Sequence, residues 1–298
     1  MKNIKYIFLV LLGGTMYGTM SSLVKLLYTK GFNAAELAFW QALLAALFLG
    51  VCTFITRKSD KGKLLYKDFL PLLLTGSAIG LTNFLYYQSV SYISASLAIV
   101  ILMQFTWFSL LLEWIIFTKK PSRLEFLTVF FILIGTLMAG NLFDVKEWSF
   151  SPKGIMLALF SSLTYAVYII ANGRVSKGVR WQAKSMSIMI GSSLSIFIIN
   201  SQTILVNNHF GSDFMLWAIF LAIVGTTIPT ALFAAGISKI GAGISSILMT
   251  IELPVAVICA YVVLNEYISP LQIAGIIIML AAITSMNYYK YLKTKKQK

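Results

Sequence analysis

The segment GISSILMTIELPVAVICAYVVL, residues 243–264, is the most informative stretch of the chain. At about 20 residues it can cross the roughly 30 Å hydrocarbon core of a bilayer as a helix, yet its centre carries Glu252 and Pro254. Pro254 has no amide hydrogen to give the carbonyl of Thr250, so the helix should kink and leave that acceptor free at membrane depth. An ionised Glu252 facing lipid would cost roughly 2.5 kcal/mol or more. We therefore expect Glu252 to face the protein interior, beside a central pathway.

The composition is that of an integral membrane protein. Of the 298 residues, 58% are hydrophobic and only 11% are charged. The net charge of +14 would suit a nucleic-acid partner, but the basic residues lie in short connectors between apolar runs, where they report membrane orientation instead. Cys52 and Cys259 lie inside apolar runs, and His209 is the only histidine. We therefore expect no disulfide framework, no metal site, no Ser/His/Asp triad and no cofactor.

The hydropathy pattern predicts ten membrane spans. The first begins beside Lys2 and Lys5 and is too long for the apolar region of a signal peptide, so we expect it to be retained. The predicted spans cover residues 4–27, 34–55, 69–90, 97–117, 124–141, 153–172, 185–206, 214–237, 243–264 and 271–289. Four prolines fall at span starts, whereas Pro229 and Pro254 are interior and mark kinks. Because the connectors are short, all function must reside in the helical bundle.

The basic residues predict the orientation. With the amino terminus inside, 20 of the 24 lysines and arginines lie on the inner side. The remaining four are Lys25, Lys30, Lys146 and Lys153. We expect a multi-pass protein of the cytoplasmic membrane, surrounded by lipid, with both termini in the cytoplasm.

The chain also repeats itself at a spacing of about 147 residues. Residues 91–95 align with residues 238–242, and residues 121–125 lie near residues 268–272 in this alignment. Since each unit would hold five spans, an odd number, the second unit must enter the membrane in the opposite sense. The sequence thus predicts an all-α protein of two inverted five-helix repeats, residues 1–141 and 142–298, the second ending in a basic cytoplasmic tail. Such repeats are characteristic of secondary transporters with a midplane site.

The motifs carry a family resemblance. Residues 252–257, ELPVAV, are followed by LNE at 264–266 and SPLQIAG at 269–275, while residues 86–96, YYQSVSYISAS, and residues 124–135 are the first-unit counterparts. With these motifs, the chain resembles the ten-helix, EamA-type members of the drug/metabolite transporter superfamily. The resemblance implies cytoplasmic termini and gradient-driven, commonly outward, transport of small metabolites such as amino acids. The first unit has Trp107 and Lys119 where the second has Pro254 and Glu266, which favours the ninth span as the functional one.

Several polar and aromatic residues within the spans are candidates for the pathway. They are Tyr17, Lys25, Gln41, Asn83, Tyr87, Gln104, Trp107, Tyr165, Asn172, Glu252 and Pro254. Each has a structural alternative: Lys25 can reach the interface or meet an anionic substrate, and Asn83 and Tyr165 can simply hydrogen-bond helices together. Gly14 and Gly18 favour close helix packing over pore lining. Glu113, near the inner end of its span, is expected to pair with Lys119 or Lys120.

The predicted function is secondary active transport, with export of small metabolites such as amino acids by alternating access. Glu252 is the candidate for proton coupling, because an isolated buried carboxyl can take up and release a proton as its surroundings change from dry to wet. A membrane-embedded enzyme would need paired aspartates, a His/Glu metal cluster or an activated serine, and the sequence offers none of these. A channel or lipid-interacting scaffold would show rings of like residues or an exposed binding domain. Nucleotide-derived solutes, sugars and hydrophobic drugs stay open as substrates, although the scarcity of charge disfavours polyanions.

Overall fold

The computed structural model describes residues 2–56, 64–93, 95–139, 151–206, 209, 211–265 and 268–296. These residues form helices and connectors and contain no β-strand. The helices are α1 (Lys2–Gly18), α2 (Met20–Thr29), α3 (Ala34–Ile55), α4 (Tyr66–Val90), α5 (Ala95–Leu102), α6 (Phe105–Phe117), α7 (Arg123–Ala139), α8 (Pro152–Arg174), α9 (Trp181–Val206), α10 (Ser212–Phe220), the π-helix η2 (Leu221–Thr227), α11 (Ile228–Ile240), α12 (Ala242–Met249), α13 (Glu252–Leu264) and α14 (Pro270–Lys296). We call α1–α7 the N-terminal half and α8–α14 the C-terminal half.

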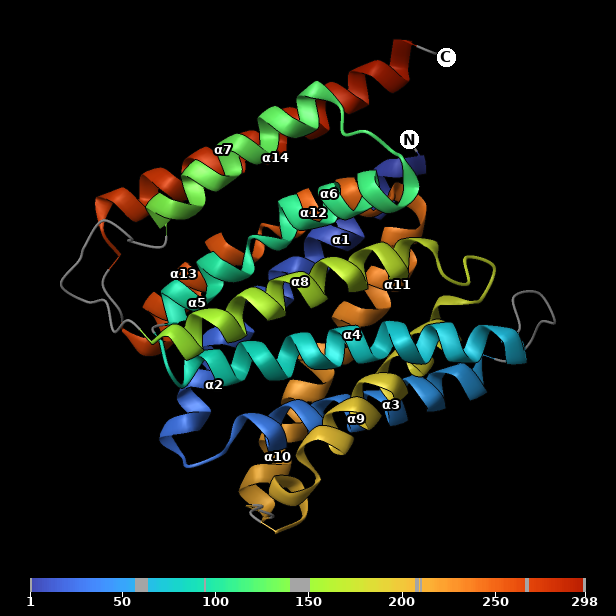
Figure 1. Cartoon of the computed structure of the whole chain (residues 1–298), viewed down its shortest axis with the longest axis vertical. Coiled ribbons are helices and arrows are strands. Elements are labelled where there is room, and N and C mark those ends of the chain that lie inside the picture. Colours follow the sequence, from blue (N-terminus) through green and yellow to red (C-terminus); the bar gives the residue numbers. More distant parts are fainter. Residues whose placement is uncertain are drawn as a thin grey trace.

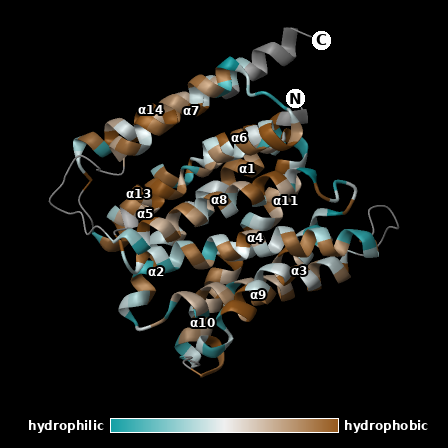
Figure 2. Cartoon of the chain, in the orientation of Figure 1, coloured by the Kyte–Doolittle hydropathy of each residue, from teal (hydrophilic) through white to brown (hydrophobic). Residues whose placement is uncertain are grey.

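The helices form a bundle whose outer surface suits lipid. Within the described residues, eight helical segments are long and apolar enough to cross a membrane, and α14 adds a shorter apolar run, Pro270–Met286. Large apolar side chains point outward, and those of Phe54, Phe126 and Ile198 are more than two-thirds exposed, at 75%, 71% and 75%. Polar residues gather at the ends of the helices (Figure 2). The chain is therefore an all-α, multi-pass membrane protein.

The start of α1 and the end of α14 lie at the same end of the bundle, on the right in Figure 1. Along one side of the bundle α7 and α14 run together (Figure 1). They approach closely because both contribute glycine: a Cβ built on Gly275 would lie 2.5 Å from the carbonyl oxygen of Gly135. Small residues of this kind let helix backbones meet in a membrane.

Helix breaks occur at matching positions in the two halves. One separates α12 from α13 at Thr250–Ile251, beside the predicted kink, and the other separates α5 from α6 at Met103–Gln104, where no proline signals it. Polar side chains add hydrogen bonds at both breaks. The Thr106 hydroxyl donates to the Met103 carbonyl at 2.9 Å, and the Thr250 hydroxyl donates to the Ile247 carbonyl at 2.7 Å. Each half-helix then ends at a residue in the left-handed region, Thr118 (φ 55°) or Asn265 (φ 54°).

The expectation of a free carbonyl at Thr250 is wrong. The Thr250 carbonyl accepts a hydrogen bond from the amide of Leu253 at 3.2 Å, because the chain tightens into a turn before α13 begins. At the second interior proline, Pro229, the helix does not simply kink. The π-helix η2 comes directly before α11, and Pro229 lies in the first turn of α11, where a missing amide hydrogen is tolerated.

Two further boundaries differ from the sequence-based expectation. The first predicted span is divided at Thr19 into α1 and α2. Pro71 lies inside α4 and not at its start, because the helix begins earlier, at Tyr66. Some predictions fall outside the described residues: the repeat boundary at 141/142, Lys146 and Glu266.

Candidate functional site

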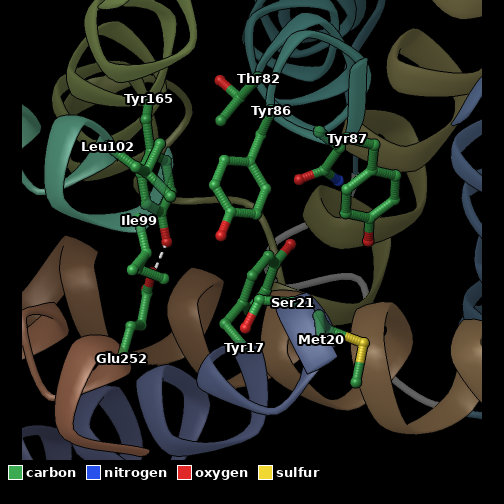
Figure 3. Close-up of a pocket in the computed structure, with 11 residues that line it drawn as sticks. Tyr17, Met20, Ser21, Thr82, Tyr86, Tyr87, Ile99, Leu102, Tyr165 and Glu252 are labelled. Carbon is green, nitrogen blue, oxygen red and sulfur yellow. Dashed lines mark hydrogen bonds between the residues drawn. The ribbon is translucent and has the colours of Figure 1, made fainter. Parts of the chain in front are cut away.

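A small polar cavity lies where the helix breaks approach α1, α2, α4 and α8. Its lining residues come from both halves of the chain (Figure 3): Tyr17, Met20, Ser21, Thr82, Asn83, Tyr86, Tyr87, Ile99, Leu102, Tyr165 and Glu252. About 30 Å³ is open to the centre of a water-sized sphere. This is space for a water molecule or two and not for a metabolite, so side chains nearly fill the cavity in this structure.

The strongest polar contact in the cavity joins Tyr165 of α8 to Glu252 of α13. The Tyr165 hydroxyl donates to Glu252 Oε1 at 2.6 Å (Figure 3), and the two residues are only 1% and 2% exposed. Glu252 is the first residue of α13, where the partial positive charge of a helix N-terminus favours a carboxylate. Phe105, the first residue of α6, packs on the Tyr165 ring with centroids 4.7 Å apart. Both helix breaks therefore contribute to the environment of this pair.

Two tyrosine hydroxyls in the cavity have unused hydrogen-bonding capacity. The hydroxyl oxygens of Tyr17 and Tyr86 are buried and have no hydrogen-bond partner within the described part of the chain. Tyr17 is held in place by stacking on Phe233, with centroids 5.4 Å apart. Buried polar atoms are normally paired, so these hydroxyls are suited to a solute or to water.

The opposite side of the cavity is held by a hydrogen-bond network around Tyr87. Gln41 Nε2 donates to the Tyr87 hydroxyl at 3.1 Å, and the Tyr28 hydroxyl donates to the Tyr87 carbonyl at 2.8 Å. Gln41 is thus placed behind the cavity wall, where it orients Tyr87 without lining the cavity. Asn83, one turn earlier on α4, does line it.

The structure brings together five of the eleven residues singled out in the sequence: Tyr17, Asn83, Tyr87, Tyr165 and Glu252 line the cavity. The others lie elsewhere. Gln104 and Trp107 bond each other at the start of α6, where Trp107 Nε1 donates to Gln104 Oε1 at 2.7 Å. Pro254 is buried in the first turn of α13, Lys25 is half-buried on α2, and Asn172 is near the end of α8.

Sequence reasoning missed several lining residues, among them Thr82 and Tyr86. A signal for both was available, because residues 82, 83, 86 and 87 share one broad face of α4 at helical spacing. Met20, Ile99 and Leu102 carry no such signal, since apolar side chains in a membrane helix face lipid as often as protein. The packing interpretation of Gly18 is confirmed: a Cβ there would lie 2.6 Å from the carbonyl oxygen of Glu252.

Polar ties between the two halves close the end of the bundle that carries the α8–α9 connector. Arg174 Nη2 lies 3.0 Å from Glu113 Oε1, the Ser176 hydroxyl donates to Asp68 at 2.8 Å, and Arg180 donates to the Thr56 carbonyl at 2.6 Å. The predicted pairing of Glu113 with Lys119 is confirmed at 3.2 Å, whereas Arg174 as a second partner was missed.

Other ties close the opposite end. His209 Nδ1 lies 3.1 Å from Glu36 Oε2, and Lys30 lies 3.4 Å from Asp213. The Lys153 ammonium donates to the Tyr92 hydroxyl at 2.8 Å. Polar ties thus join the two halves at both ends of the bundle, and the cavity between them is nearly filled by side chains.

A multi-pass helical bundle that encloses a small polar cavity between two tied halves has the architecture of a membrane transporter. The model of the EamA-like transporter family matches residues 4–140 and again residues 152–288. The chain therefore belongs to the EamA-like transporter family.

Relatives agree with this assignment. An uncharacterized transporter of Synechocystis sp., sll1319, is 26% identical over 237 residues, 74% of this chain and 68% of that protein. The threonine/homoserine exporter RhtA of Escherichia coli K12 is 24% identical over 269 residues, 88% of this chain and 82% of the exporter. A solved structure described only as "Crystal structure of protein" shares the fold, with a TM-score of 0.70 and 14% identity over 97% of this chain and 98% of that one.

Proposed function

We propose that this protein is a secondary active transporter that exports small metabolites, amino acids or related compounds, across the cytoplasmic membrane. The observation that carries the proposal is the buried Glu252–Tyr165 pair, which stands at a helix break inside a cavity lined by both halves. A closed polar cavity at the meeting point of two halves is what alternating access requires of an occluded state. Tyr17, Asn83, Tyr87, Tyr165 and Glu252 would contact the solute.

We further propose ten spans in two inverted repeats, residues 1–141 and 142–298, with α7 and α14 as the fifth and tenth spans. Support comes from helices that begin 147 residues apart in the two halves: Ala34 and Trp181, Ala95 and Ala242, Phe105 and Glu252, Arg123 and Pro270. The double match of the family model supports the same division.

Both termini are proposed to be cytoplasmic, because the basic residues then gather inside. Cysteine labelling can test this on a background with Cys52 and Cys259 replaced. Ser59→Cys should react only from the cytoplasm and Asn208→Cys only from outside; both positions lie outside the described residues. Labelling of both from one side would overturn the inverted repeat.

The substrate proposal has two supports. The Escherichia coli relative is named for the export of threonine and homoserine. Glu252 is the one charged side chain among the residues that line this cavity, so a polyanion would meet no basic partner there. A small zwitterion suits the cavity better, since its ammonium group can meet Glu252 and its carboxylate can accept from the unpartnered hydroxyls of Tyr17 and Tyr86.

Proton coupling is proposed through Glu252. Its carboxyl is sealed from solvent in this conformation and would meet water when either end opens. A carboxyl that alternates between these environments can take up and release a proton.

The decisive test is flux in proteoliposomes. Purified protein should give saturable uptake of radiolabelled L-threonine or another small amino acid, with counterflow when unlabelled substrate is trapped inside. A channel would give flux without saturation or counterflow. If a panel of amino acids, sugars and nucleosides gives neither uptake nor counterflow, the transport proposal fails for these substrates.

A further inference from the structure

A lysine is buried at the end of the bundle that carries the α8–α9 connector. Lys184, on the first turn of α9, is 1% exposed, and its ammonium donates to the backbone carbonyl of Asn172. Within the described part of the chain no carboxylate lies at ion-pairing distance from it. An ammonium has three donors, and burying a charge without a counter-charge is costly. The position therefore favours an anionic group that the described part of the chain does not supply.

The neighbouring side chain has unused capacity of the opposite kind. Asn172 is 0% exposed, and its Nδ2 donates to the Tyr168 hydroxyl at 3.1 Å. Its Oδ1 is buried and has no hydrogen-bond partner within the described residues. An unused acceptor thus lies beside unused ammonium donors. An α-amino acid carries the complementary pair, a carboxylate and an ammonium group on one carbon atom.

These residues continue a line of polar groups from the central cavity. Tyr165, Tyr168 and Asn172 lie on one face of α8, and the rings of Tyr165 and Tyr168 stack with centroids 6.2 Å apart and planes at 12°. Asn172 is seven residues beyond Tyr165, about 10 Å along the helix axis. Lys184 is therefore too far from Glu252 for one small amino acid to contact both residues at once. The two positions are separate binding sites.

We propose that Lys184 and Asn172 form a second substrate site, which receives an amino acid before it reaches the central cavity. This inference rests on the proposed transport function. The Lys184 ammonium donates to the substrate carboxylate, while the substrate ammonium donates to Asn172 Oδ1. The stacked tyrosines of α8 then lead from this site to Glu252.

Access to the site is controlled by the α8–α9 connector, which runs between Asn172 and Lys184. Its Arg174, Ser176 and Arg180 make the ties to the N-terminal half described above. Parting these ties would uncover the site from that end of the bundle. The site then binds substrate from the connector face and not from the opposite face.

The test compares Lys184→Met with Lys177→Met. Lys177 is an exposed lysine of the same connector, so its loss removes one positive charge from the same end of the bundle without removing a hydrogen-bond donor from the site. Initial rates are measured from each face in oriented proteoliposomes, with L-threonine and with threonine amide, which lacks the carboxylate. Lys184→Met should raise the KM for L-threonine at the connector face by about tenfold or more, because a charge-assisted hydrogen bond is lost. The KM at the opposite face, the KM for the amide and all values for Lys177→Met should stay within about twofold.

An unchanged connector-face KM in Lys184→Met would overturn the inference while leaving the proposed transport intact. An equal rise at both faces, or for the amide, would reduce Lys184 to a structural support. For variants or substrates that give no measurable flux, substrate binding is measured instead, by its effect on the melting temperature. L-threonine should raise the melting temperature of the wild-type protein in detergent. The less severe Lys184→Gln should show a smaller rise, because only the contribution of the central cavity is left, and a rise equal to that of the wild type would overturn the second site. Equal stabilisation by acetate would remove the role of Asn172 and so overturn the site as stated.

Discussion

Replacing Tyr165 by phenylalanine tests the central pair directly. The change deletes one hydroxyl and keeps the ring, which is 1% exposed and packed between Phe105 and Tyr168. Little packing is therefore lost. What disappears is the donor 2.6 Å from Glu252 Oε1, at a carboxyl that is only 2% exposed.

The magnitude follows from burial. Removing one partner of a buried hydrogen bond leaves the other without compensation and costs about 1–3 kcal/mol. If the occluded state alone makes this bond, the free energy of that state rises by the same amount relative to the open states. At 1.4 kcal/mol per factor of ten, the ratio of occluded to open molecules falls by about 5- to 150-fold. We expect slower counterflow of L-threonine and a lower melting temperature in detergent.

The control is Tyr261→Phe, which removes a hydroxyl from a 55% exposed tyrosine on α13, the helix that carries Glu252. It should leave counterflow and melting temperature unchanged. The reasoning is refuted if Tyr165→Phe exchanges substrate at the wild-type rate and melts at the wild-type temperature, because the bond to Glu252 would then contribute nothing to the occluded state.

Three further predictions concern the same machinery. Glu252→Gln keeps the shape and hydrogen bonding of a neutral carboxyl but cannot ionise, so it should retain exchange and lose accumulation driven by a pH gradient; accumulation that persists would make Glu252 a substrate ligand or an interhelical tie. Pro254→Ala should insert and fold, but its transport rate should fall because the helix can now continue across the α12–α13 break. Transport at the wild-type rate would show that the proline matters only for packing. Glu113→Gln removes the carboxylate that pairs with Arg174 and should lower the free energy of unfolding by about 1–2 kcal/mol. The loss is smaller than for a fully buried ion pair because the Arg174 side chain is 33% exposed. Glu113→Gln should also speed labelling of a cysteine placed at Lys184 from the connector face, and an unchanged labelling rate would argue against the tie as a closure of that end.

Some features of the site could be predicted from local pattern alone. Glu252 stands out because a carboxyl is rare in an apolar run, and Tyr165 stands out because it shares a helical face with Tyr168 and Asn172. Gln41 is a candidate by its residue type, but its place behind Tyr87 depends on how α3 meets α4. The sequence places Lys184 directly before the predicted span 185–206, where it reads as a basic connector residue, because burial and the absence of a counter-charge among the described residues cannot be read from sequence.

Of the two helix breaks, one could be predicted from the sequence and the other could not. A proline lacks the amide hydrogen that a helix needs, so the break beside Pro254 could be predicted from the sequence. The matching break at Met103–Gln104 has no such residue; it is held by hydroxyl and amide side chains that bond nearby carbonyls. Ser, Thr and Gln are common inside helices, and only their partners distinguish a break from a continuous turn.

The sequence by itself determined the class of the protein, the approximate apolar spans and the presence of a carboxyl within one of them, because the bilayer imposes length and hydropathy on each helix separately. Only the tertiary structure decided which polar residues meet in the cavity, that side chains nearly fill it, and that the connector from Arg174 to Arg180 ties the two halves. These properties depend on the rotation of each helix about its axis and on its neighbours. Inside a membrane, apolar residues satisfy lipid and protein contacts alike, so hydropathy does not fix that rotation, and packing between helices does.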